Sequence, residues 1–138
     1  MILTEAQRLT LARLANVLIP AGNGFPSASE AGVAEAFLDR VAAARPDLAK
    51  VLPAILELAE NRDPAEVIDE LQTEDPEAFG VLAELVPGAY FLNPEVRRAL
   101  RYHGQTAQPI DPHPDYEEDG LLQSVIQRGP IYRATPTD

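Results

Sequence analysis

The sequence predicts an all-α protein, a compact array of about six or seven short helices with an extended C-terminal arm. Helix-start signals recur along the first hundred residues, and each precedes apolar residues spaced as on one helix face. No stretch alternates apolar and polar residues or is rich in β-branched residues, as a strand would be. The length of 138 residues suits one well-buried domain and is too short for two.

Capping boxes open the first two predicted helices. Thr4 and Gln7 begin a helix that should end at Pro20, with an inner face of Leu11, Leu14, Ala15 and Leu18. Ser27 and Glu30 repeat the pattern and predict a second, continuous helix up to the break at Arg45-Pro46. Its inner face would hold Val33, Phe37 and Val41.

Prolines predict the boundaries of the helices that follow. Pro53 should kink or split a third helix over residues 47–61, because proline donates no hydrogen bond and clashes with the preceding turn. Three Asx-Pro pairs then mark helix starts, since the Asx side chain caps the helix and proline presets φ of its first residue. They predict helices over about 64–73, 76–89 and 94–102.

The composition changes after Gly104. Residues 105–120 are rich in proline and acidic residues, with little apolar material to offset the entropy of ordering them. A short helix is expected around Leu121, Leu122, Val125 and Ile126. We therefore expect a helical domain over 1–104 and a Pro-rich arm over 105–138, packed on the domain or on a partner.

Charge and composition exclude several functions. The chain has 22 acidic and 11 basic residues, and its net charge of −11 repels nucleic acid. The sequence has no cysteine, which excludes disulfides, thiol nucleophiles and iron–sulfur clusters. No segment reaches the 18 apolar residues of a membrane span, and no signal peptide or twin arginine precedes the first helix. We expect a cytoplasmic protein without membrane insertion, although export together with a partner stays compatible with the sequence.

No pattern predicts a catalytic, cofactor-binding or metal site in this chain. His103 and His113 lack the helical spacing of a metal pair. An acidic loop matches positions one, three, five and six of an EF-hand at Asp115, Glu117, Asp119 and Gly120. Ile126, however, stands where the bidentate glutamate is required, so the calcium interpretation fails.

The segment PGAYFLNPEVRRALRYHGQ, residues 87–105, concentrates aromatic and basic side chains in an otherwise acidic chain. Aromatic residues and arginine are enriched where proteins bury contact surface. The end of the arm repeats this chemistry. We predict a partner interface formed by Tyr90, Phe91, Arg97, Arg98, Arg101, Tyr102, Arg128, Tyr132 and Arg133. The alternative is that the aromatics are core residues and the arginines pair with nearby acids such as Glu95.

Three segments resemble one known family. GAYFLNPEVRRALRYHGQ resembles the aromatic-rich motif of the gluconate 2-dehydrogenase subunit 3 family, in which a Gly-x-Tyr-aromatic stretch leads into an Asx-Pro-Glu-Val helix. LTEAQRLTLARLANVLIPA is similar to the usual start of that family, and ASEAGVAEAFLDRV is similar to its second helix. Together these segments cover about half of the first 105 residues.

The resemblance implies a function that the residues alone do not. Members of this family are small, cofactor-free subunits that accompany a large FAD-dependent oxidoreductase of the glucose-methanol-choline type, often with a cytochrome subunit, acting on sugars and related alcohols. For this chain the resemblance implies a non-catalytic subunit that binds and stabilises such a flavoprotein, with FAD in the partner and none in this chain. Two alternatives stay open: a small enzyme using His103 and Tyr102 with a nearby carboxylate, or a self-associating helical scaffold.

Overall fold

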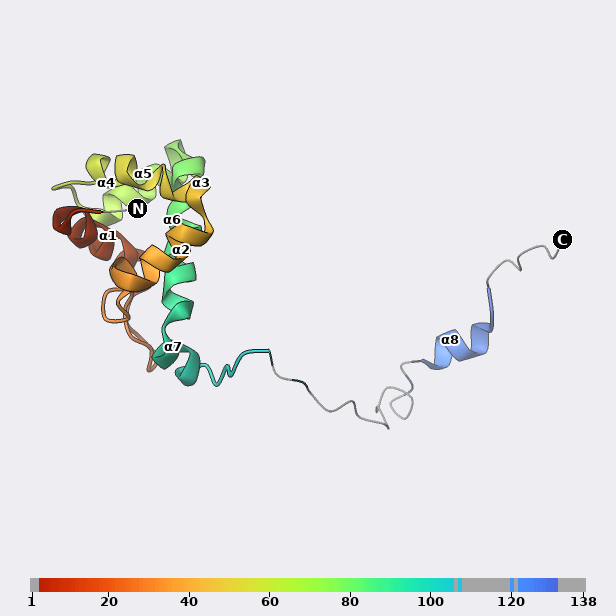
Figure 1. Ribbon diagram of the computed structural model, residues 1–138. Helices are drawn as coiled ribbons and strands as arrows, with labels where there is room; N and C mark the ends of the chain where they lie inside the picture. Colours follow the sequence, from red (N-terminus) through yellow and green to blue (C-terminus); the bar gives the residue numbers. More distant parts are fainter. Residues whose placement is uncertain (1–2, 106, 108–119, 121, 132–138) are drawn as a thin grey trace. The chain divides into compact units, whose positions relative to one another are not determined.

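A computed structural model describes residues 3–105, 107, 120 and 122–131. The chain divides into two units, Met1–Gly104 and Gln105–Asp138, which are considered separately. Among the described residues the regular elements are helices and there is no strand (Figure 1). The predicted all-α class is therefore confirmed.

The first unit holds all but one of the helical elements in the described part of the chain. In order they are α1 (Glu5–Leu18), the π-helical turn η1 (Val33–Phe37), α2 (Leu38–Ala44), α3 (Pro46–Ala49), α4 (Leu52–Leu58), α5 (Pro64–Glu74), α6 (Pro76–Leu92) and α7 (Pro94–Ala99). The second unit contains α8 (Gln123–Arg128).

The predicted caps begin the helices as the sequence indicates. The Thr4 hydroxyl accepts from the Gln7 backbone N–H at 3.2 Å, and the Thr4 backbone N–H donates to the Gln7 side chain at 3.0 Å. Asp63, Asp75 and Asn93 each accept from a backbone N–H of the turn that follows, at 2.7 to 3.1 Å. These signals act within three residues, so local sequence suffices to predict them.

The prediction of one continuous helix from Ser27 to Arg45 is wrong. Ser27 and Glu30 do exchange capping hydrogen bonds, at 2.7 and 3.3 Å. The backbone then leaves the helix at Gly32, whose φ is 70°, and again at Glu35, whose φ and ψ are −109° and −136°. Regular helix resumes only at α2. Glycine adopts this left-handed conformation readily because it lacks a Cβ atom.

Other helix boundaries differ less from the prediction. The third predicted helix is split into α3 and α4, with Pro53 in the first turn of α4, where its missing N–H costs nothing. Helix α6 continues to Leu92 with Pro87 inside it, three residues beyond the predicted end. Helix α7 ends at Ala99, earlier than predicted.

Helix α6 forms the centre of the first unit and contacts every other helical element of that unit. Figure 1 shows it in green, running through the unit with α7 at its C-terminal end. Four of its side chains are completely buried: Leu82, Leu85, Val86 and Ala89. They pack with fully or almost fully buried residues of the surrounding helices, namely Leu11, Leu14, Leu38, Leu52, Leu56, Val67 and Val96. Removal of this apolar surface from water is the main stabilising contribution to the fold.

Two glycine-to-alanine substitutions should change stability in opposite directions. Gly32→Ala forces an L-residue into a left-handed conformation and should lower the free energy of unfolding by about 1 kcal/mol or more. Gly80 is inside α6, with open space where alanine would add a methyl group. Gly80→Ala should therefore raise the free energy of unfolding by up to about 1 kcal/mol. Urea denaturation measures both. Equal effects would show that the break at Gly32 is not required by the fold.

Candidate functional site

The buried half of the aromatic-rich segment ties α6 to the loop before η1. The Tyr90 side chain is only 4% exposed, and its hydroxyl donates to the Pro26 carbonyl oxygen at 2.7 Å. The Asn93 side-chain amide donates to the Ala31 carbonyl oxygen at 2.9 Å, while its side-chain oxygen caps α7. Two side chains of one segment thus fix a loop more than sixty residues earlier in the sequence.

Close contact between α6 and α2 depends on Gly88. A Cβ atom at this position would lie 3.2 Å from Cγ1 of Val41 and 3.6 Å from its Cγ2. The glycine of the aromatic-rich segment therefore has a packing role, because it lets the C-terminal part of α6 approach α2. Val96 of α7 completes the buried half of the segment.

The exposed half of the segment presents apolar and basic side chains to solvent. Phe91, Leu100 and Tyr102 are 50%, 46% and 53% exposed. The rings of Phe91 and Tyr90 meet edge to face, with centroids 5.5 Å apart and planes at 79°. Because Tyr90 is fixed by its hydrogen bond, it gives the exposed Phe91 ring a rigid neighbour.

A hollow of about 340 Å³ lies beside Phe91. It is formed between this segment and the loop that follows α1, and its lining consists of Ile19, Pro20, Gly22, Asn23, Phe25, Tyr90, Phe91 and Leu100. The lining is mostly apolar. Its size and chemistry suit an apolar side chain from another molecule better than a charged group.

The structure separates the predicted interface residues into two groups. Phe91, Tyr102 and the three arginines of the segment are exposed, so they are accessible to a partner. Tyr90 is a core residue and its side chain is not accessible to a partner. This corrects its inclusion in the predicted interface. The helical spacing of Val96 and Leu100 predicts that both lie on the inner face of the helix, but Leu100 is 46% exposed, because α7 ends at Ala99 before reaching it.

The arginines of the segment differ in their pairing. Arg98 forms an ion pair with Glu95 at 2.7 Å, as the alternative interpretation of the sequence expects. Arg97 and Arg101 have no ion-pair partner among the residues that the structure describes. Within the described ranges these two exposed guanidinium groups therefore have no carboxylate partner, and Arg101 stands between the half-exposed Leu100 and Tyr102 in sequence.

Tyr102 and His103 line a separate open hollow of about 430 Å³ together with Pro94, Arg97 and Arg98. The acid–base alternative needs a carboxylate beside these two residues. No carboxylate is among these lining residues, all of which belong to the described part of the chain. Arg97 and Arg98 give this hollow positive charge, which Glu95 partly offsets through its ion pair of 2.7 Å with Arg98.

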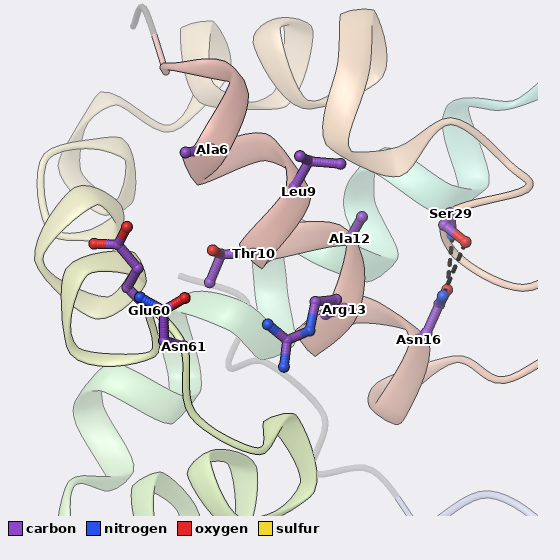
Figure 2. A pocket seen from close by; sticks show the side chains of 9 residues that line it. All are labelled: Ala6, Leu9, Thr10, Ala12, Arg13, Asn16, Ser29, Glu60 and Asn61. Atoms are coloured by element: carbon purple, nitrogen blue, oxygen red, sulfur yellow. Dashed lines mark hydrogen bonds between the residues drawn. The ribbon is translucent and has the colours of Figure 1, made fainter.

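A further hollow, of about 500 Å³, lies on the outer side of α1 (Figure 2). Leu9 is 59% exposed there, an apolar residue outside the predicted inner face of the first helix. Three of its polar lining residues have partners: Asn16 and Ser29 exchange two hydrogen bonds of 2.9 Å, and Arg13 donates to the Arg62 carbonyl at 2.7 Å. The other polar lining residues are Thr10, Glu60 and Asn61.

Some predicted residues lie beyond what the structure describes. Tyr132, Arg133, His113 and the acidic loop at Asp115, Glu117 and Asp119 lie outside the described residues, as does most of the predicted arm. Arg128 is the last residue of α8 and is exposed. In the described ranges no three potential metal ligands gather. None of the helices described there has the length and apolar character needed to cross a bilayer.

Comparisons of the chain with models of known protein families, with curated proteins and with solved structures gave no match. The resemblance to the gluconate 2-dehydrogenase subunit 3 family therefore depends on the three sequence segments alone.

Asn93 should contribute more to stability than a cap alone. Asn93→Ala removes the acceptor for the Glu95 N–H and the donor to the Ala31 carbonyl, so we expect a loss of about 2 kcal/mol in the free energy of unfolding. Asp63→Ala removes only a helix cap and should cost about 1 kcal/mol. Urea denaturation distinguishes the two. Equal losses would mean that the contact with Ala31 contributes nothing.

Tyr90 should make the protein sensitive to alkaline pH. Burial, and secondly the negative charge of Glu30, raise the pKa of Tyr90 above its ordinary value of 10.0. As the pH rises, Tyr90 therefore ionises at a lower pH in the unfolded chain than in the folded protein. The contribution of its protonated hydroxyl to folding stability is complete below pH 10.0 and is lost as the pH rises through the pKa of the folded state. Ionisation also removes the proton donated to Pro26.

The matched variant is Tyr90→Phe, which should lower stability at neutral pH by about 1 kcal/mol through loss of one hydrogen bond. Above pH 10 it should lose less further stability than the natural protein. Chemical denaturation at several pH values provides the comparison. Parallel curves for the two proteins would contradict a role for Tyr90 ionisation.

Proposed function

We propose that the chain is a non-catalytic small subunit that binds and stabilises a large FAD-dependent dehydrogenase or oxidase acting on sugars or related alcohols. One observation supports this best: the three segments that resemble the gluconate 2-dehydrogenase subunit 3 family contact one another. They are residues 3–21, 28–41 and 88–105. The resemblance therefore involves three segments that are distant in sequence and are joined in one packed unit.

The contacts between these segments are specific. The Ala28 backbone N–H donates to the Ile19 carbonyl at 3.0 Å, and the Arg8 guanidinium forms an ion pair with Asp39 at 3.0 Å. These bonds join the first segment to the second. The contacts of Asn93 with Ala31 and of Gly88 with Val41 join the second to the third.

The division of the aromatic-rich segment into a buried and an exposed half supports a binding role. Its buried residues hold the three segments together, while Phe91, Leu100 and Tyr102 leave apolar surface in contact with water. A partner that covers this surface gains free energy from the burial, and the exposed arginines can form charge-assisted hydrogen bonds around it. The same partner would hold FAD, and this chain would hold no cofactor.

Stabilisation is the effect that such a subunit has without chemistry of its own. A protein that binds only the folded form of a partner shifts the folding equilibrium of that partner by mass action. The flavoprotein should therefore lose FAD and activity at a lower temperature when it is produced without this chain.

The test is to purify the affinity-tagged chain from its native host and to produce the same chain alone. From the host it should co-purify with a large protein that shows flavin absorbance and oxidises a sugar or alcohol. Produced alone, it should be colourless and inactive toward sugars with any electron acceptor. Turnover or flavin binding by the chain alone would contradict the proposal, as would recovery from the host without a flavoprotein.

A further inference from the structure

Arg101 has an unusual backbone conformation at the end of α7. Its φ is 56°, in the left-handed region. The Tyr102 N–H donates to the Arg97 carbonyl at 2.9 Å and the Arg101 N–H donates to the Arg98 carbonyl at 3.0 Å. This pair of bonds is the Schellman motif, in which the left-handed position is normally glycine.

Arginine is an unfavourable residue for that position. An L-residue in the left-handed region suffers a clash between its Cβ atom and the following carbonyl, which glycine avoids. The other left-handed residues in the described part of the chain are glycines and two asparagines, Asn23 and Asn61, whose side chains tolerate this conformation. A strained residue at an exposed turn leads to the hypothesis that its side chain has a role outside the turn.

The surroundings of Arg101 indicate what that role is. Its side chain is exposed on a chain of net charge −11, and neither it nor Arg97 has an ion-pair partner among the described residues. Leu100 and Tyr102 flank it, and both are about half exposed. Leu100 and Phe91 also line the mostly apolar hollow of about 340 Å³ beside the loop after α1, whereas Arg97 and Tyr102 line the separate hollow of about 430 Å³. Arg101 lies between Leu100 and Tyr102 in sequence, and so between residues of the two hollows. Positive charge therefore adjoins apolar surface at the end of one short helix.

We propose that Phe91, Arg97, Leu100, Arg101 and Tyr102 form a docking surface for a protein segment with an apolar side chain between carboxylates. The apolar side chain occupies the hollow, and the carboxylates pair with Arg97 and Arg101. The proposal rests on the proposed function in one respect, since it takes the flavoprotein as the protein that carries this segment. Charge complementarity determines the chemistry of the occupant.

Other occupants fit this surface less well. A two-fold dimer would place the same patch on both sides of the interface, so that the unpaired arginines of two copies would face each other. Nucleic acid would be repelled by the net charge of the chain. A small anion would pair with the arginines and leave Phe91 and Leu100 uncovered.

The decisive variant is Arg101→Gly, because the proposal predicts opposite effects on stability and on binding. Glycine relieves the left-handed strain, so the urea midpoint should rise or stay unchanged. The dissociation constant for the flavoprotein should increase about tenfold or more, as for truncation of a central interface residue. The control is Asn61→Gly, which replaces another left-handed residue on a different part of the unit and should leave the dissociation constant unchanged.

A second measurement tests the surface without the flavoprotein. The probe is a synthetic peptide with Leu-Phe between glutamates, added to the full chain while backbone NMR signals are recorded; its counterpart has lysines in place of the glutamates. Only the glutamate peptide should shift the signals of Phe91, Arg97 and residues 100–102, and added salt should weaken the shifts. Equal shifts with both peptides, or none, would overturn the docking surface.

The outcomes separate this inference from the proposed function. If Arg101→Gly binds the flavoprotein as tightly as the natural chain does, the proposed function stands and the docking surface is wrong. If no flavoprotein binds but the glutamate peptide does, the docking surface stands and the proposed function is wrong. A dimer that Arg101→Gly dissociates would identify a second copy as the occupant and overturn the proposal.

Discussion

Burial of α6 is the constraint on which the rest of the first unit depends. Leu82, Leu85, Val86 and Ala89 lie on one face of α6 and are completely covered, so the surrounding helices must pack against that face, while Ala83 and Glu84 stay exposed. Helices as short as α3, α4 and α7 are marginal on their own in water, so their stability comes from packing against this central element. The interior continues through Tyr90, and the turn at Asn93 then directs α7 away from the axis of α6.

The position of the exposed patch follows from that arrangement. Tyr90 and Phe91 are adjacent in sequence and point about 100° apart around α6; Tyr90 faces the core, whereas Phe91 is half exposed. Asn93 then fixes the start of α7 by capping it and by binding the Ala31 carbonyl. Val96 anchors α7 in the core and Arg97, next to it, is exposed; Leu100 and Arg101 follow the end of α7 at Ala99 and are exposed as well.

The features that sequence predicted correctly are those whose causes lie within a few residues. The capping box at Thr4 and the Asx-Pro helix starts depend only on neighbouring side chains. The break near Gly32 was not predicted because it belongs to a loop that distant residues hold in place. Tyr90 donates to Pro26 and Asn93 donates to Ala31, and each of these partners lies more than sixty positions earlier in the sequence. The basic and aromatic composition of the candidate site was visible in the sequence, but burial of Tyr90 and exposure of Leu100 depend on how α6 and α7 are rotated against the core.

The arginines of the first unit show how one residue type serves two purposes. Arg8, Arg45 and Arg62 each pair with a carboxylate from another part of the chain: Arg8 with Asp39, Arg45 with Glu84, and Arg62 with Glu70. These pairs join segments, and in the last of them the Arg62 guanidinium lowers the pKa of the Glu70 carboxyl. Near the end of α7, Arg98 is neutralised locally by Glu95, whereas Arg97 and Arg101 are not paired within the described chain. A chain with twice as many acidic as basic residues can pair most of its arginines internally. Two exposed guanidinium groups without a carboxylate among the described residues, one of them on a strained backbone, are what the proposed docking surface would need to bind carboxylates of another molecule.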